Sequence, residues 1–385
     1  MKVQRQKMVF LAGLIMYWSS VFGAAPTATP AATNEQPAKL ITHDEVIIPG
    51  GKILPYTVDG KWKVFNLVAE PVSQVVYSDS IDELRQYVPQ MDRYKGLEMS
   101  LPLKKQTLSG WGYNGSIPGP AIVVHNGDAV RIVVENKLPE ATSIHWHGII
   151  LPNKDDGTGS TTEPVLEPGK KRTYEFEMHQ EGTFMYHSGF NDTKQVRRGL
   201  GGFFIALPEK KKGDREVVKD FAILLQEFTL QKGTAEPVIF SMDPNWFTFN
   251  GLSSPNIPAL VVNQGDAVRI RYGNLGELSH PIHLHGYSFN VTGTEGGPIQ
   301  KSAQWPAATV EISPGQTRDI QLVANNPGVW RLHCHKLLHI VSDNSYWAHL
   351  QIVQNLGIVP VGGMFSFFVV KQNSNDDSPY WDTLP

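Results

Sequence analysis

The stretch GDAVRI occurs twice in this chain, at residues 127–132 and again at residues 265–270, an offset of 138 (265 − 127). Each copy lies inside a longer run, residues 121–134 and residues 259–272, in which apolar and polar side chains alternate. Alternation with a period of two is typical of a β-strand that buries one face. Two copies of one β-domain are therefore predicted.

A second repeat extends the duplication toward the C-terminus. Gly182–His187 matches Gly328–His333 at an offset of 146 (328 − 182). Glycine, proline and asparagine turns bound the alternating runs, and no long helical pattern separates them. We therefore predict an all-β fold of two Greek-key β-sandwich domains in tandem.

The first residues have the composition of a secretory signal. Lys2, Arg5 and Lys7 precede an apolar run, and small residues follow it. This pattern predicts a signal peptide at residues 1–23 and a periplasmic or secreted protein, and a short amphipathic anchor is the alternative.

Composition sets the remaining domain limits. We predict a flexible N-terminal segment at 24–61, a first domain at 62–208, a linker at 209–217, a second domain at 218–372 and a flexible tail at 373–385. The formal net charge is −3 and no basic stripe occurs, so a nucleic-acid partner is not predicted. No later apolar stretch is long enough to cross a bilayer, so a membrane partner is not predicted either.

The only cysteine lies in the stretch HCHKLLH, residues 333–339, so an intramolecular disulfide is ruled out. In an extended segment Cys334 faces one way while His333 and His335 face the other. Two metal sites would then lie back to back across one strand. A thiolate combined with imidazoles suits copper.

Six further histidines, at positions 145, 147, 187, 280, 283 and 285, sharpen this interpretation, and with those of HCHKLLH they account for nine of the thirteen in the chain. Two imidazoles and one thiolate in a plane, with a weak axial thioether, form a blue-copper site. We assign His280, Cys334 and His339 as equatorial ligands and Met364 as the axial ligand, although a methionine before a strand is equally compatible with core packing.

A third match gives the position of Met364. Residues 201–203 align with residues 362–364 at an offset of 161 (362 − 201), which gives the second domain about 15 extra residues (161 − 146) before its last strand. Met364 would then begin the strand that returns beside the cysteine.

The first domain lacks the sulfur site, because Thr142, Ser188 and Thr193 occupy the positions of the three equatorial ligands. The seven other imidazoles suit a copper cluster that bridges the two domains; they are His145, His147, His187, His283, His285, His333 and His335.

These residues fall in four motifs: SIHWHG (143–148), MYHSG (185–189), HPIHLHG (280–286) and HCHKLLH (333–339). With them the chain resembles the multicopper oxidases, specifically the two-domain, laccase-like members, over residues 62–372. The resemblance implies cupredoxin-like domains and up to four copper ions. It also implies type 2 ligands His145 and His283, and type 3 ligands His147, His187 and His335 on one copper and His285 and His333 on the other. Because His333 and His335 are covalent neighbours of Cys334, the three residues also give a short through-bond electron route from the sulfur site to the cluster.

The implied activity is one-electron oxidation of a reductant at the type 1 copper, coupled to reduction of dioxygen to water. Phenols, aromatic amines and metal ions such as Mn(II) all remain possible reductants. No methionine-rich insert occurs, so a dedicated cuprous oxidase is not favoured. The short connection at 208–214 and the resemblance both predict a homotrimer.

One position departs from the family pattern. The second motif normally ends in His-x-His, but Gly189 replaces its last histidine, so a water, a hydroxide or His179 would have to complete that type 3 site.

Two alternative functions remain open. A non-catalytic copper or electron-transfer protein with a degenerate cluster is the first, and copper nitrite reductase is the second, although Ser188 stands where that enzyme has its cysteine.

Overall fold

The computed structural model describes residues 39–78, 80, 105–209, 217, 219–341 and 362–372. The predicted signal peptide, the tail and most of the linker lie outside this range. The described residues belong to one unit that begins at Lys39. None of their helices is both long and apolar enough to cross a membrane.

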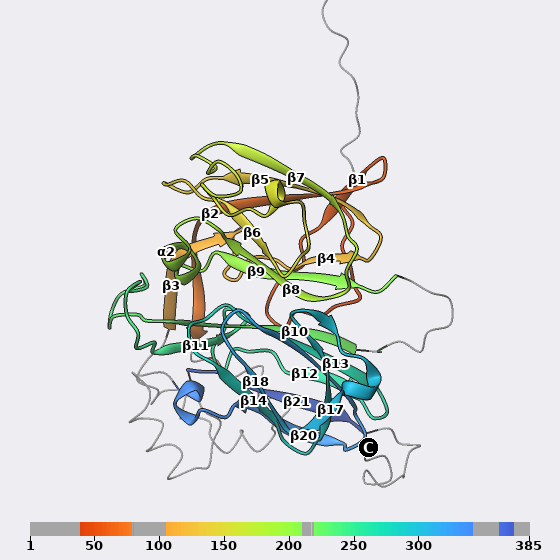
Figure 1. Ribbon diagram of the computed structural model, residues 1–385. Helices are drawn as coiled ribbons and strands as arrows, with labels where there is room; N and C mark the ends of the chain where they lie inside the picture. Colours follow the sequence, from red (N-terminus) through yellow and green to blue (C-terminus); the bar gives the residue numbers. More distant parts are fainter. Residues whose placement is uncertain are drawn as a thin grey trace, which may run out of the picture. The chain divides into compact units, whose positions relative to one another are not determined.

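The first sandwich consists of two sheets (Figure 1). One has the order β1 (Tyr56–Asp59), β2 (Trp62–Ser78), β5 (Ala129–Asn136) and β7 (Lys171–Glu177), with β3 (Lys105–Tyr113) also on β2. The other has the order β4 (Ile122–His125), β9 (Gly201–Leu207), β8 (Gly182–Ser188) and β6 (Ile144–His147).

The second sandwich repeats this plan with additional strands. Its first sheet has the order β11 (Trp246–Phe249), β10 (Lys219–Phe228), β13 (Ala267–Asn274), β19 (Thr317–Val323), β15 (Phe289–Thr294) and β16 (Gly297–Pro298), with β17 (Trp305–Ala307) on β15. Its second sheet has the order β12 (Leu260–Asn263), β21 (Phe365–Lys371), β20 (Gly328–Cys334), β14 (His280–Leu284) and β18 (Thr309–Ile312).

Helices are few and short within the described residues. They are α2 (Asp192–Arg197) and the 3-10 turns η3 (Asn153–Asp155), η4 (Lys301–Ala303) and η5 (Leu337–Ile340). The predicted all-β class is confirmed. The duplication also appears in the pairing, because β2 runs parallel to β5 as β10 runs parallel to β13, and β4 runs parallel to β9 as β12 does to β21.

The alignment that located Met364 is corrected by three residues. In the first sandwich His187 pairs with Gly201, and in the second His333 pairs with Phe365. Gly201 is therefore equivalent to Phe365, at an offset of 164 (365 − 201), so the insertion is 18 residues long (164 − 146) rather than 15. The Gly-Gly match was misleading, because strand register is set by backbone pairing and Gly362 precedes the strand.

Part of the segment predicted to be flexible is instead paired with both sandwiches. We call residues 39–54 the N-terminal strap. Within it, Ile41 pairs with Tyr56, Ile47 with Phe221 of β10, and Ile53 with Ala121 beside β4. These pairings satisfy backbone polar groups that would otherwise be buried without partners.

A buried polar network joins the two sandwiches. Thr183 of β8 donates a hydrogen bond from Oγ1 to Asp319 Oδ1 of β19 at 2.6 Å, and Arg271 donates to the same Thr183 oxygen at 2.8 Å. Arg271 also pairs with Asp220 through two 2.8 Å hydrogen bonds. All four side chains are buried. Since buried charges require such partners, the network specifies how β8 packs on the second sandwich.

Candidate metal centres

The sulfur site is assembled by adjacent strands of one sheet. Cys334 of β20 lies opposite Ile282 of β14, which places it next to His280, and η5 brings His339 back toward them. Cys334 Sγ is 3.8 Å from His280 Nδ1 and 3.6 Å from His339 Nδ1, and the two nitrogens are 3.0 Å apart. All three side chains are buried. The predicted equatorial ligands thus lie together with their donor atoms converging.

Met364 lies beside this group. Its amide donates to the carbonyl of His339 at 2.9 Å, and its carbonyl accepts from the amide of Cys334 at 3.1 Å. The residue is fully buried. Leu200 holds the equivalent position in the first sandwich, where its carbonyl accepts from the amide of Ser188 at 3.3 Å.

The protonation state of the site depends on its burial. Burial raises the pKa of the Cys334 thiol to about 12 and lowers the pKa of the His339 imidazole to about 3. A metal ion that binds here therefore finds the lone pair of a neutral His339 imidazole and displaces the proton of the Cys334 thiol.

Glu227 orients His280, a role that the sequence patterns did not reveal. Its Oε2 lies 3.1 Å from His280 Nε2, the ring nitrogen that faces away from the cysteine. Its Oε1 accepts from the amide of Leu278 at 2.9 Å. A carboxylate on the second ring nitrogen fixes the orientation of a metal-ligating histidine. Glu227 has no motif around it and precedes His280 by 53 residues, so no local signal was available.

The first sandwich replaces the sulfur site with an amide. Gln195 of α2 is fully buried, and its Oε1 accepts hydrogen bonds from Thr142 Oγ1 at 2.7 Å and Ser188 Oγ at 2.6 Å. Thr193, which the alignment matched with His339, is exposed. The side chain that closes this position is therefore Gln195, which satisfies both hydroxyl groups without a metal.

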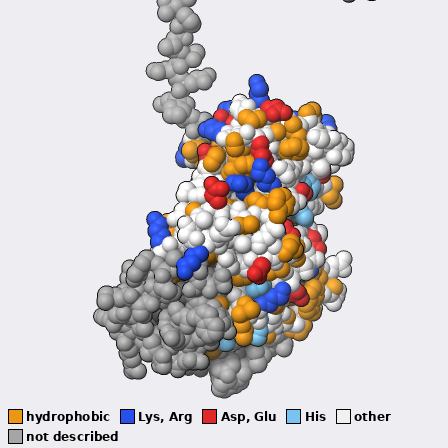
Figure 2. All heavy atoms as spheres, turned by 90° about the vertical axis from the view of Figure 1, so that its left-hand side faces the viewer, with side chains coloured by type: hydrophobic (Ala, Val, Ile, Leu, Met, Phe, Trp, Pro, Cys, Tyr) orange, Lys and Arg blue, Asp and Glu red, His pale blue; other side chains and the backbone are white. Residues whose placement is uncertain are grey.

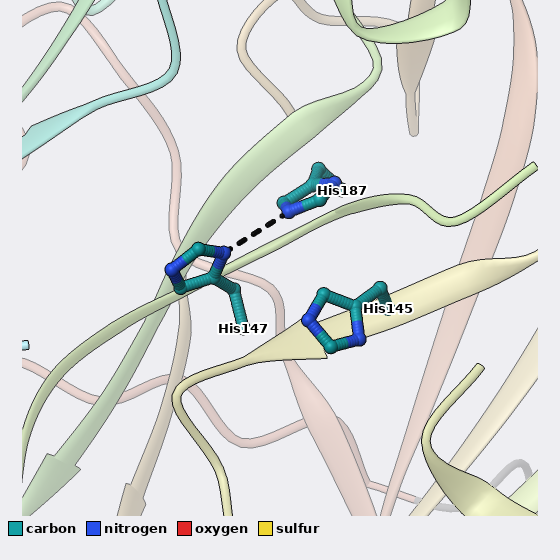
Figure 3. Close-up of side chains that lie close together, drawn as sticks. All are labelled: His145, His147 and His187. Atoms are coloured by element: carbon teal, nitrogen blue, oxygen red, sulfur yellow. Dashed lines mark hydrogen bonds between the residues drawn. The ribbon is translucent and has the colours of Figure 1, made fainter. Parts of the chain in front are cut away.

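The first histidine set consists of His145 and His147 of β6 and His187 of β8, whose rings face one another (Figure 3). Strand pairing places His145 opposite His187. His147 Nδ1 is 3.2 Å from His187 Nε2, and donor atoms of all three lie within 4.8 Å of one another. Burial lowers the pKa of His187 to about 4 and also lowers that of His147. A glycine in the left-handed region, Gly148 (φ 85°), ends β6 directly after His147.

The second set consists of His283, His285, His333 and His335. His285 Nε2 is 3.1 Å from His333 Nε2, and the ring centroids of His333 and His335 are 5.6 Å apart. Burial lowers the pKa of His333 to about 4. This set lies on the opposite side of β20 from the Cys334 thiol, as the alternation of strand side chains requires.

Backbone carbonyls determine which ring nitrogen is free in both sets. The Nδ1 atoms of four histidines lie 2.7–2.9 Å from carbonyl oxygens, and the pairs are His145 with Asp156, His187 with Ser188, His283 with Ala308, and His333 with Cys334. An Nδ1–H that donates to a carbonyl leaves Nε2 as the lone pair for a metal. The sulfur site differs, because there the Nδ1 atoms face the cysteine.

The two histidine sets do not meet within one chain. No hydrogen bond or ring contact joins them in the part of the chain that the structure describes. His147 lies instead beside the turn between β18 and β19, where a Cβ added to Gly315 would be 3.5 Å from His147 Cε1. His335 of the second set is exposed.

Gly189 has a structural reason for lacking a side chain. A Cβ at this position would collide with the carbonyl oxygen of Gly157 and would lie 3.1 Å from Ser143 Oγ. The Gly157 loop is held here because the amide of Gly159 donates to the carbonyl of Gly189 at 3.2 Å. The loop therefore occupies the direction in which the family's second histidine would project. His179 does not belong to the convergent group of the first set.

The donor sets fit copper. One thiolate with two imidazoles suits a blue-copper centre, and imidazoles alone suit copper that changes between its two oxidation states. Two multicopper oxidase family models match the chain, at residues 98–211 and 227–346. The chain belongs to the multicopper oxidase family.

Curated members of the family resemble parts of the chain. A multicopper oxidase of Staphylococcus aureus is 27% identical over 217 residues, which is 54% of this chain and 47% of the relative. Copper resistance protein A of Pseudomonas syringae pv. tomato is 40% identical over 135 residues, 34% of this chain and 21% of the relative. The chain spans about half the length, or less, of the curated relatives it matches.

Solved structures match more of the chain. Blue copper oxidase from Nitrosomonas europaea is 26% identical with a TM-score of 0.64, covering 84% of this chain and 90% of the other. Copper nitrite reductase from the same organism has a TM-score of 0.57 over 82% of this chain and 96% of the other, and at 19% identity it shows the shared fold alone. The predicted cupredoxin-like fold of the two sandwiches is thereby confirmed.

Proposed function

We propose that the chain is a copper-dependent oxidase that takes single electrons from a reductant at the sulfur site and delivers four of them to dioxygen at the imidazole site. One observation carries the proposal. Cys334, the only cysteine, is the last residue of β20, and its two neighbours in the chain, His333 and His335, face the opposite side. The two kinds of site are thus joined by a few covalent bonds. Bound copper supplies the one-electron chemistry at both.

We assign His280, Cys334, His339 and Met364 as type 1 ligands. His145 and His283 are the proposed type 2 ligands, and His147, His187, His285, His333 and His335 the type 3 ligands. Converging donor atoms support the type 1 group and the first histidine set. In each histidine set burial lowers the pKa of one member, His187 or His333, to about 4. The overall reaction is balanced when four one-electron oxidations accompany the uptake of four protons and the reduction of one dioxygen to two waters.

A pocket beside Glu227 supports a binding place for the reductant. It is lined by Glu227 and Phe228 together with Arg197, Met242 and Leu278. Glu227 therefore contacts both this pocket and the outer nitrogen of His280. A phenol or aromatic amine bound here would place its donor atom one side chain away from a type 1 ligand.

We further propose that the imidazole site forms between chains of a homotrimer. The separation of the two histidine sets within one chain supports this arrangement. Large apolar side chains close in sequence to both sets are exposed, with Ile150 at 83%, Leu337 at 62% and Leu338 at 67%, and such exposure is typical of interaction surfaces. Figure 2 shows histidine and hydrophobic side chains reaching the surface of one face of the molecule. A head-to-tail contact that closes after three chains completes three sites.

Four measurements test these proposals. Copper analysis gives about four ions per chain for an oxidase and about one for an electron carrier. Oxygen uptake with a phenol, an aromatic amine and Mn(II) identifies the reductant class. If no oxygen is taken up and nitrite is reduced instead, the oxidase is rejected. Light scattering on the copper-loaded protein gives three times the chain mass for the ring, whereas a single chain mass in an active preparation would reject it. Secretion or periplasmic location, proposed from residues 1–23, is checked by cell fractionation.

A further inference from the structure

Three side chains outside the copper groups form another convergent cluster. His43 and Glu45 belong to the N-terminal strap, and His125 ends β4. His43 Nδ1 lies 2.7 Å from Glu45 Oε2, and His125 Nε2 lies 3.3 Å from Glu45 Oε1. One donor atom from each residue lies within 4.8 Å of the others, as in the sulfur site and the first histidine set.

The cluster is shielded from solvent and has donor capacity left over. The side chains of His43 and His125 are only 8% and 13% exposed. Within the described part of the chain, His43 Nε2 is buried and has no hydrogen-bond partner. A buried polar atom without a partner is costly unless a ligand satisfies it. The ring of His43 is held in place between Tyr56 and His125, with centroids 5.4 Å from each.

An ion pair supports the backbone of His125. Lys63 pairs with Asp128 at 2.5 Å, and Asp128 also accepts from the amide of His125 at 2.7 Å. These contacts position His125 from behind while its Nε2 faces Glu45.

We propose that His43, Glu45 and His125 bind a divalent transition-metal ion of the zinc type, in a site separate from the copper sites of the proposed oxidase. Two imidazoles and one carboxylate are a preferred ligand set for Zn²⁺, with water in the fourth position. Because the ligands are nitrogen and oxygen atoms without sulfur, the site does not need a redox-active ion. Its place on the strap, which pairs with both sandwiches, assigns it a structural role.

The position of the cluster indicates what the ion does. It would fasten the strap to β4 of the first sandwich at Glu45, two residues before Ile47 pairs with Phe221 of the second sandwich. The amide of Ile47 donates to the carbonyl of Asp220 at 2.7 Å, and the amide of Leu54 donates to that of Ala121 at 2.8 Å. A metal ion here therefore stabilises a segment that contacts both sandwiches.

Metal analysis tests binding directly. Copper-loaded full-length protein is equilibrated with Zn²⁺ and its zinc content is measured. We expect about one zinc per chain in the wild type. Loss of a direct ligand should weaken the zinc affinity at least ~10-fold in Glu45→Gln and in His125→Gln. Glu177→Gln, an exposed carboxylate of the same sandwich, is the matched control and should bind as the wild type does. Unchanged blue absorption shows that each variant has folded.

The results separate the metal site from a purely hydrogen-bonded triad. Zinc that is absent from the wild type, or that is retained equally by both ligand variants, overturns the proposal. If copper takes the site itself, the wild type carries one copper more than Glu45→Gln, which supports the site with a different ion. Failure of the oxidase assay leaves these zinc counts unaffected, so the two proposals fail independently.

Hydrogen exchange supplies a second readout. Addition of Zn²⁺ should slow amide exchange at Ile47 and Leu54 in the wild type and have no effect in Glu45→Gln. Equal exchange in the wild type with and without bound zinc would show that the ion does not fasten the strap.

Discussion

The amide of Cys334 donates a hydrogen bond to the carbonyl of Met364 at 3.1 Å, although 30 residues (364 − 334) separate them along the chain. This contact is the first step of the pairing between β20 and β21, which continues with His333 opposite Phe365. The backbone of the proposed axial ligand is thus held directly against that of the thiolate ligand.

Met364→Leu should raise the reduction potential of the type 1 copper while the protein stays blue. Loss of the thioether removes electron donation that favours the oxidised ion, whereas the equatorial ligands that produce the colour remain. Redox titration of the absorption measures the shift. Met178→Leu, another buried methionine, is the control. An unchanged potential in Met364→Leu would show that this residue only fills the core.

Cys334→Ser should abolish the intense absorption near the red end of the visible range and reduce the copper content by one ion per chain. The histidine sets do not include the sulfur, so they should retain their copper. Ser188→Ala is the matched control, since Ser188 is the equivalent residue of the first sandwich and bonds Gln195 rather than a metal. Blue colour in Cys334→Ser would disprove the type 1 assignment.

Gly189→Ala should lower the free energy of unfolding by about 1–3 kcal/mol, because the added Cβ collides with the Gly157 carbonyl. Gly189→His should do so too and should not raise the copper content, since the loop blocks the imidazole. Denaturant unfolding and copper analysis check both outcomes. Gly296→Ala is the control, as the nearest atom to its added Cβ is 3.5 Å away. A gain of copper in Gly189→His would show that the loop moves aside readily.

Thr183→Val should lower the free energy of unfolding by about 1–3 kcal/mol, because it keeps the shape of the side chain but leaves Asp319 Oδ1 without its donor. The loss acts on contacts between the sandwiches. Thr173→Val, at an exposed position of β7, should change stability by less than about 0.5 kcal/mol. Equal effects of the two substitutions in urea unfolding would show that the buried network does not stabilise the packing of the sandwiches.

The strand pattern and the metal-binding motifs were predictable because both are local. Alternation along residues 121–134 and 259–272 places every second side chain on one face, and this predicts β-strands whatever surrounds them. The same rule predicted that the cysteine of β20 and its two neighbouring histidines would face opposite sides. The spacing of residues within one strand thus reported the direction of their side chains.

Other relationships depend on how strands pair and how loops pack, and no spacing encodes them. The three-residue correction at Met364 came from the backbone register of β20 and β21. Glu227 reaches His280 only because β10 and β14 lie in facing sheets of one sandwich, and the bar to a side chain at Gly189 comes from a loop that folds over it.

The clearest contrast is the cluster in the strap. His43 and Glu45 are close in sequence, but His125 is 82 residues (125 − 43) beyond the first of them. The sequence by itself determined the two β-sandwiches and the residues of the copper motifs, because side-chain alternation and short motifs act within single strands. Only the tertiary structure decided which distant side chains meet, because backbone pairing of the strap with both sandwiches, rather than any local preference, brings their donor atoms together.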